Sequence, residues 1–142
     1  MKEVLESLEM KNHYYEKFLS TTLKLLNQAR NNVWDELEFY VDNRERILNI
    51  IRSYDHKISE QMSEKEVSAS DKDRYKHQVQ ALLDTRAILA KKIVDADLEL
   101  ISRIDEMKMD TIKELKQNIE TEQHFSTFNK NGNTKKSSKR AA

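Results

Sequence analysis

Proline and cysteine are absent from this chain of 142 residues, and glycine occurs only once, at position 132. Proline and glycine interrupt helices and form tight hairpin turns, so nothing before Gly132 stops a helix or favours a β-hairpin. Without cysteine the chain has no disulfide bond and no thiolate metal site, which is compatible with a reducing compartment. These absences nearly exclude a β-rich fold.

Long apolar runs are also missing. Apolar residues make up 37% and charged residues 35% of the chain, and the mean hydropathy is −0.86. No stretch approaches the roughly 20 apolar residues that cross a membrane. The first six residues, MKEVLE, lack the apolar run of a signal peptide. We therefore expect a cytoplasmic protein without a membrane span, whose core is a thin seam between helices.

Charge is balanced over the chain but unevenly distributed. The 25 basic and 25 acidic residues give a net charge of zero. Residues 129–142 contain five basic residues and no acidic one, so this segment carries +5 and the rest of the chain −5. The polar composition of the segment predicts a disordered basic tail. The acidic body gives no reason to expect specific binding to nucleic acid.

Apolar residues recur at helical spacing in three long segments, at about 2–30, at about 33–62, and from about 72 to 119 or beyond. Each segment therefore predicts an amphipathic helix that buries one stripe. The stripes comprise Leu5, Leu8, Tyr15, Leu19, Leu23 and Leu26 in the first segment, Trp34, Leu37, Val41, Leu48, Ile51, Ile58 and Met62 in the second, and Tyr75, Val79, Leu82, Leu89, Ile93, Leu100, Ile104 and Met107 in the third.

Two polar stretches predict the turns between these helices. The first is Arg30-Asn31-Asn32, because asparagine disfavours helix interiors and tolerates the left-handed geometry of a helix C-terminus. The second is the run 63–72, where Ser70 and Asp73 resemble a capping signal for the next helix.

The expected fold is all-α, an antiparallel helical hairpin that becomes a bundle of three long helices. Residues 1–128 are expected to form the helical bundle domain and residues 129–142 the disordered basic tail. The pattern leaves open whether the third helix is continuous or whether its last part forms a fourth, short C-terminal helix.

Four charged residues interrupt the apolar stripes of the second and third segments: Arg44, Asp55, Arg86 and Asp97. Polar residues in a seam between helices usually fix register or orientation. We therefore expect them to align the helices rather than to perform chemistry.

Signatures of catalysis and metal binding are missing. Helical bundles bind metals through Glu-x-x-His pairs, and no histidine of this chain has a glutamate three residues before it. His77 follows Asp73, and His124 follows Glu120, by four residues, and we interpret both pairs as solvated side chains. One glycine cannot form a phosphate-binding loop, and there is no cysteine nucleophile. We expect no enzymatic activity, no cofactor and no catalytic or metal-binding residue.

Binding to another protein is the function that the stripes favour. Three helices around a thin seam leave a groove, which an amphipathic helix of a partner fills with its own apolar stripe. The third segment is longer than the second, so its last apolar residues lack a partner within the hairpin. The predicted partner-binding residues are Leu37, Val41, Leu48, Ile93, Leu100, Ile104, Ile112, Leu115 and Ile119.

Three stretches, NNVWDEL at 31–37, NRERIL at 43–48 and IVDADLELI at 93–101, resemble flagellar export chaperones of the FliT/FlgN class. The resemblance covers residues 19–116. It implies a small cytosolic helical chaperone of the flagellar type III export system. Such a chaperone binds the C-terminal amphipathic helix of a filament-cap or hook–filament junction protein, prevents premature assembly, and delivers its client to export-apparatus components. A mobile C-terminal helix of that class would correspond to residues 112–128.

A self-associating coiled-coil scaffold or adaptor without an export client is the alternative. Strict heptad spacing with charged flanks favours self-assembly, whereas a wide stripe interrupted by charges favours a specific register within one chain. The interruptions favour the latter, and the formation of a homodimer stays open.

Overall fold

The computed structural model of the chain describes the backbone of residues 1–64 and 69–131 and the side chains of residues 1–63 and 69–122. Three helices account for most of these residues: α1 (Lys2–Arg30), α2 (Leu37–Glu64) and α3 (Ala69–Asn131). The described residues contain no strand. The prediction of an all-α bundle of three long helices is therefore confirmed. None of the three helices, over the parts described, is long and apolar enough to cross a membrane.

The chain divides into two compact units, Met1–Ile101 and Ser102–Ala142. The first unit contains α1, α2 and the start of α3. The described part of the second unit is the remainder of α3, up to Asn131.

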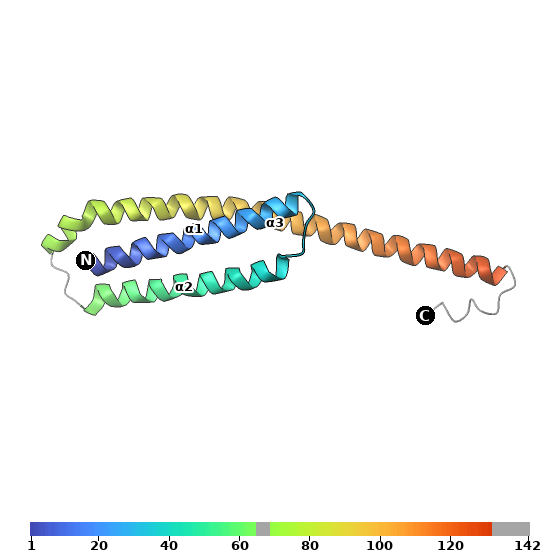
Figure 1. Cartoon of the computed structure of the whole chain (residues 1–142), viewed down its shortest axis with the longest axis horizontal. Coiled ribbons are helices and arrows are strands. Elements are labelled where there is room, and N and C mark those ends of the chain that lie inside the picture. The colour runs from blue at the N-terminus through green and yellow to red at the C-terminus, as the bar shows by residue number, and fades with distance from the viewer. Residues whose placement is uncertain (65–68, 132–142) are drawn as a thin grey trace. The chain divides into compact units, whose positions relative to one another are not determined.

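In the first unit, α1 and α2 are antiparallel (Figure 1). Ser7 Oγ, near the start of α1, donates to Gln61 Oε1, near the end of α2, over 3.0 Å. Further along, the hydroxyls of Thr22 and Tyr40 lie 3.0 Å apart. Since residue numbers rise along α1 as they fall along α2, these contacts fix the antiparallel register.

The first part of α3 runs parallel to α1 and antiparallel to α2 (Figure 1). Asn12 Nδ2 donates to the carbonyl oxygen of Leu82 over 3.0 Å. Nearer the end of α1, Arg30 bonds to Glu99. The contact nearer the end of α1 also involves the later residue of α3, as expected when two helices run parallel.

The core lies where all three helices meet. Phe18 of α1, Ile47 and Ile51 of α2 and Ile93 of α3 are buried together, and the half-buried Tyr14, Tyr15, Leu19 and Leu48 pack around them. Burying one such side chain stabilises the fold by about 1.5–3 kcal/mol.

The predicted stripe of the first helix is partly wrong. Leu5, Leu8 and Leu26 are buried, whereas Leu23 is 47% exposed. Phe18, which lies outside the predicted stripe, is buried. The reason is that α1 contacts α2 on one side and α3 on another, so its buried arc is wider than a single stripe.

The turn after α1 forms where the asparagines predict it. Asn32 has a left-handed φ of 59°, the N–H of Asn32 donates to Ala29 O, and that of Val33 donates to Gln28 O. These two bonds are the Schellman arrangement that satisfies the last carbonyls of a helix. The predicted start of the second helix at Val33 is wrong, since α2 begins at Leu37. The reason is that the backbone N–H of Val33 bonds to the last turn of α1.

The predicted start of the third helix at about Lys72 is also wrong. It begins at Ala69, so residues 69–72 of the expected polar turn are helical, with Asp71 in the first turn, where a negative charge favours a helix N-terminus. Its C-terminal part extends past Ile119, as the pattern allows, and α3 is one helix up to Asn131, because no proline or glycine stops it before Gly132. The expected basic tail overlaps α3 at residues 129–131, and residues 132–142 lie outside the described residues.

Candidate helix-binding groove

The predicted partner-binding residues fall into different environments. Ile93 and Leu100 are buried in the core of the first unit, and Leu48 packs half-buried against the core cluster. Leu37 and Ile104 are half-buried. Val41 in α2 is exposed, as are Ile112, Leu115 and Ile119 in the second unit. The structure therefore does not bring these nine residues together at one surface of the first unit.

An open groove of about 290 Å³ lies between α1 and the first part of α3. Its apolar lining comes from Leu19, Leu23 and Leu26 of α1 and Ala96 of α3. Its charged lining comes from Arg30 of α1 and from Lys92, Asp95 and Glu99 of α3. The groove thus combines an apolar floor with charges of both signs.

The sequence forms this floor through spacing and side-chain size. Leu19, Leu23 and Leu26 recur at intervals of four and three residues, which places them on one face of α1. Leu26 is buried, whereas Leu23 remains 47% exposed. Ala96 is buried, and because its side chain is only a methyl group, it leaves space for the groove between α3 and α1. Ala96 was absent from the predicted site residues, and its small size within an apolar stripe was the available signal.

A bidentate ion pair joins the two walls of the groove. Arg30 Nε and Nη2 donate to the two carboxylate oxygens of Glu99 over 2.6 and 2.7 Å. The hydrogen bond to Glu99 raises the pKa of Arg30. Because both side chains remain partly exposed to solvent, the pair contributes little to stability and mainly defines this part of the groove.

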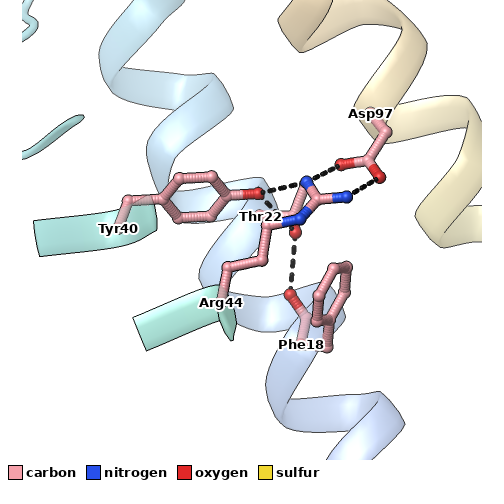
Figure 2. Close-up of polar contacts among 5 residues, drawn as sticks. All are labelled: Phe18, Thr22, Tyr40, Arg44 and Asp97. Carbon is pink, nitrogen blue, oxygen red and sulfur yellow. Dashed lines mark hydrogen bonds and ion pairs between the residues drawn. The ribbon is translucent and has the colours of Figure 1, made fainter. Parts of the chain in front are cut away.

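A polar network between the helices joins all three of them and fixes their register (Figure 2). Arg44 of α2 donates to both carboxylate oxygens of Asp97 in α3 over 2.7 Å. Arg44 Nη1 also donates to Tyr40 Oη over 3.1 Å. The guanidinium lies 4.7 Å from the centre of the Phe18 ring. The prediction that Arg44 and Asp97 align helices is confirmed, because both are joined across α2 and α3.

The direction of the hydrogen bonds follows from Thr22, which is fully buried. Its only hydroxyl proton is donated to the Phe18 carbonyl oxygen over 2.9 Å. Thr22 Oγ1 must therefore accept the proton of Tyr40, whose hydroxyl lies 3.0 Å away. Tyr40 can in turn accept from Arg44, and each buried polar group in the chain of bonds is satisfied.

The charge of Arg44 is stabilised in this setting. Hydrogen bonds to Asp97, and secondarily to Tyr40, raise the pKa of Arg44 against the opposing effect of burial. Of the other two predicted alignment residues, Asp55 forms an ion pair with Lys11 of α1, and Arg86 is exposed on α3.

Residues 1–63 and 69–122 contain no group of three or more histidine, aspartate or glutamate side chains placed to hold a metal ion. Asp73 and His77 are both exposed.

Comparison with known proteins found no matching family model, no matching curated protein and no matching solved structure. Since no relative indicates a function, we infer one from the groove between α1 and α3.

Proposed function

We propose that this protein is a helix-binding chaperone whose groove between α1 and α3 holds an amphipathic helix of a client protein. The observation that supports this function is the apolar floor of Leu19, Leu23, Leu26 and Ala96 between two parallel helices. A client helix in this groove converts the three-helix bundle into a four-helix bundle and buries its own apolar stripe.

The charged lining defines the kind of helix that fits. Lys92 and Arg30 supply positive charge, and Asp95 and Glu99 supply negative charge, along the same groove. A client helix with an apolar stripe flanked by charges of both signs is complementary to it. Leu23 is the main apolar contact still available, because about half of its surface is exposed in the free protein.

The resemblance of residues 19–116 to flagellar export chaperones supports a client class. The client is then the C-terminal amphipathic helix of a filament-cap or hook–filament junction protein, bound in the cytosol. Covering the apolar stripe of such a helix prevents its premature assembly, and release to export-apparatus components completes the cycle. Both steps require binding and no covalent chemistry.

A matched pair of substitutions tests the groove. Leu23→Asp places a carboxylate on the floor, whereas Ile88→Asp changes a similarly exposed apolar residue of α3 that does not line the groove. Binding of labelled peptides from the C-terminal helices of cap and junction proteins is measured by fluorescence anisotropy. Loss of one leucine contact and burial of a charge together are expected to weaken binding at least about 10-fold for Leu23→Asp.

Thermal unfolding of both variants shows whether the bundle is intact. Equal affinity of the wild type, Leu23→Asp and Ile88→Asp would place the client elsewhere on the protein. Failure of the wild type to bind any of these peptides would remove the flagellar client class.

A further inference from the structure

A second apolar stripe on α3 is distinct from the residues that this helix buries. Among the described side chains of α3, the buried ones are Leu89, Ile93, Ala96 and Leu100. The second stripe consists of six residues that are between 52% and 62% exposed: Val94, Leu98 and Ile101 in the first unit, and Ile112, Leu115 and Ile119 in the second. Exposed apolar residues at regular spacing on a helix mark an interaction surface.

The spacing of these six residues is that of a coiled coil. Positions 94, 98, 101, 105, 108, 112, 115 and 119 are separated alternately by four and three residues, the a and d positions of a heptad repeat. Asp105 and Lys108 occupy the two central positions, and both are exposed. We call these eight residues the α3 seam.

We propose that the α3 seam pairs with the α3 seam of a second copy of this protein in an antiparallel coiled coil. The pairing is centred between Glu106 and Met107 of each chain. It places Val94 opposite Ile119, Leu98 opposite Leu115, and Ile101 opposite Ile112 of the second copy. Because an antiparallel pair is symmetric, each of these three apolar layers occurs twice.

Charge complementarity supports the second copy as the occupant. The antiparallel alignment places Asp105 opposite Lys108 of the second copy, twice. One layer beyond the apolar residues, it places Lys91 opposite Glu122, both of which are exposed. Every apolar residue of the seam thus meets an apolar residue, and every charge meets its opposite.

Other alignments of the same seam are unfavourable. A parallel, in-register pair places Asp105 against Asp105 and Lys108 against Lys108. An antiparallel pair shifted by one heptad places Leu115 against Asp105, and Ile112 against Lys108. The charges therefore specify one orientation and one register, as polar residues in coiled-coil seams do.

Within the first unit, the seam residues and the groove lie on separate surfaces of α3. Lys92, Asp95 and Ala96 line the groove, and helical periodicity places them on a different side of α3 from Val94, Leu98 and Ile101. Pairing of two copies leaves the groove open, so this inference is independent of the proposed client binding.

A charge swap in the full-length protein tests the pairing. Sedimentation equilibrium is expected to show a wild-type dimer. Lys108→Glu places a carboxylate opposite Asp105 of the other chain, and it is expected to weaken the dimer at least about 10-fold, as is Asp105→Lys. The double variant Asp105→Lys/Lys108→Glu restores opposite charges in both central layers and is expected to recover the wild-type dimer. In a parallel pair the double variant would keep like charges in both layers.

Cross-linking provides a second measurement, because the chain has no cysteine of its own. Asp105→Cys and Lys108→Cys variants, mixed and oxidised, are expected to form a mixed disulfide dimer faster than either variant alone. Leu23→Asp is expected to leave the dimer unchanged. A wild-type protein that stays monomeric, or a double variant that does not recover dimerisation, overturns the pairing while leaving client binding intact.

Discussion

The hydroxyl group of Thr22 fixes the register between α1 and α2. It is fully buried, donates to Phe18 O in its own helix, and accepts the hydroxyl proton of Tyr40 from α2. A threonine in a helix interior ordinarily satisfies its hydroxyl within its own helix. Here the hydroxyl oxygen also accepts a hydrogen bond from Tyr40 of the neighbouring helix.

Replacing Thr22 by valine is therefore expected to destabilise the bundle. The substitution keeps the shape but leaves the buried Tyr40 hydroxyl without its acceptor, at a cost of about 1–3 kcal/mol. Urea denaturation followed by circular dichroism measures the free energy of unfolding.

Tyr40→Phe is the matched control for Thr22→Val. This substitution removes the hydroxyl that donates to Thr22, while Thr22 keeps its own bond to Phe18. No buried hydroxyl proton is then left unpaired, so the expected cost is about 0.5–1.5 kcal/mol. The double variant should lose less than the sum of the two single variants, since no buried hydroxyl is left unpaired. Strict additivity would show that the two hydroxyls do not interact.

At the scale of elements, the turn between α1 and α2 is determined by local backbone chemistry. Asn32 adopts a φ of 59°, and its side chain oxygen accepts a hydrogen bond from Trp34 Nε1 over 2.9 Å. Left-handed geometry costs ordinary residues about 1–2 kcal/mol, and less for asparagine. The asparagine cluster at the end of the first segment thus predicts the turn.

Substitution of Asn32 by valine is expected to lower the free energy of unfolding by about 1–2 kcal/mol, because a β-branched residue is disfavoured at positive φ. Asn32→Gly, which tolerates this geometry, is expected to change it by less than about 1 kcal/mol despite loss of the bond to Trp34. Thermal and urea unfolding of the two variants make the comparison. Similar losses for both would mean that the hydrogen bond, and not the backbone, determines the turn.

At the scale of the whole molecule, the two units differ in how their helices are stabilised. The first unit buries apolar residues from three helices, whereas Ile112, Leu115 and Ile119 of the second unit are exposed within one chain. A single helix without tertiary packing is marginally stable in water. The second unit therefore depends most strongly on the proposed pairing of two copies.

Amide hydrogen exchange tests this dependence. Residues 102–122 are expected to be protected in the wild-type dimer and to exchange at least about 10-fold faster in Lys108→Glu, because loss of the pair removes the packing of the helix. Amides in the middle of α1 and α2 should exchange at equal rates in both proteins and serve as the internal control. Unchanged protection of residues 102–122 in a monomeric variant would show that this helix is stable by itself.

The sequence by itself determined the helical class, the three long helices and the first turn. These features depend on local properties: the absence of proline and early glycine, the helical spacing of apolar residues, and the asparagines after Arg30. It also identified Arg44 and Asp97 as alignment residues, since charges inside an apolar stripe need partners.

Only the tertiary structure decided which apolar residues face the core and which remain available. The seam residue Leu98 and the core residue Leu100 both lie at helical spacing with apolar neighbours, and a periodic pattern does not specify which face meets α1 and α2. The groove likewise required the packing of α1 against α3, because Leu23 and Ala96 lie far apart in the sequence and form a floor only when the helices lie side by side. Local chemistry determines a helix, whereas the choice of its buried face depends on the helices that pack against it.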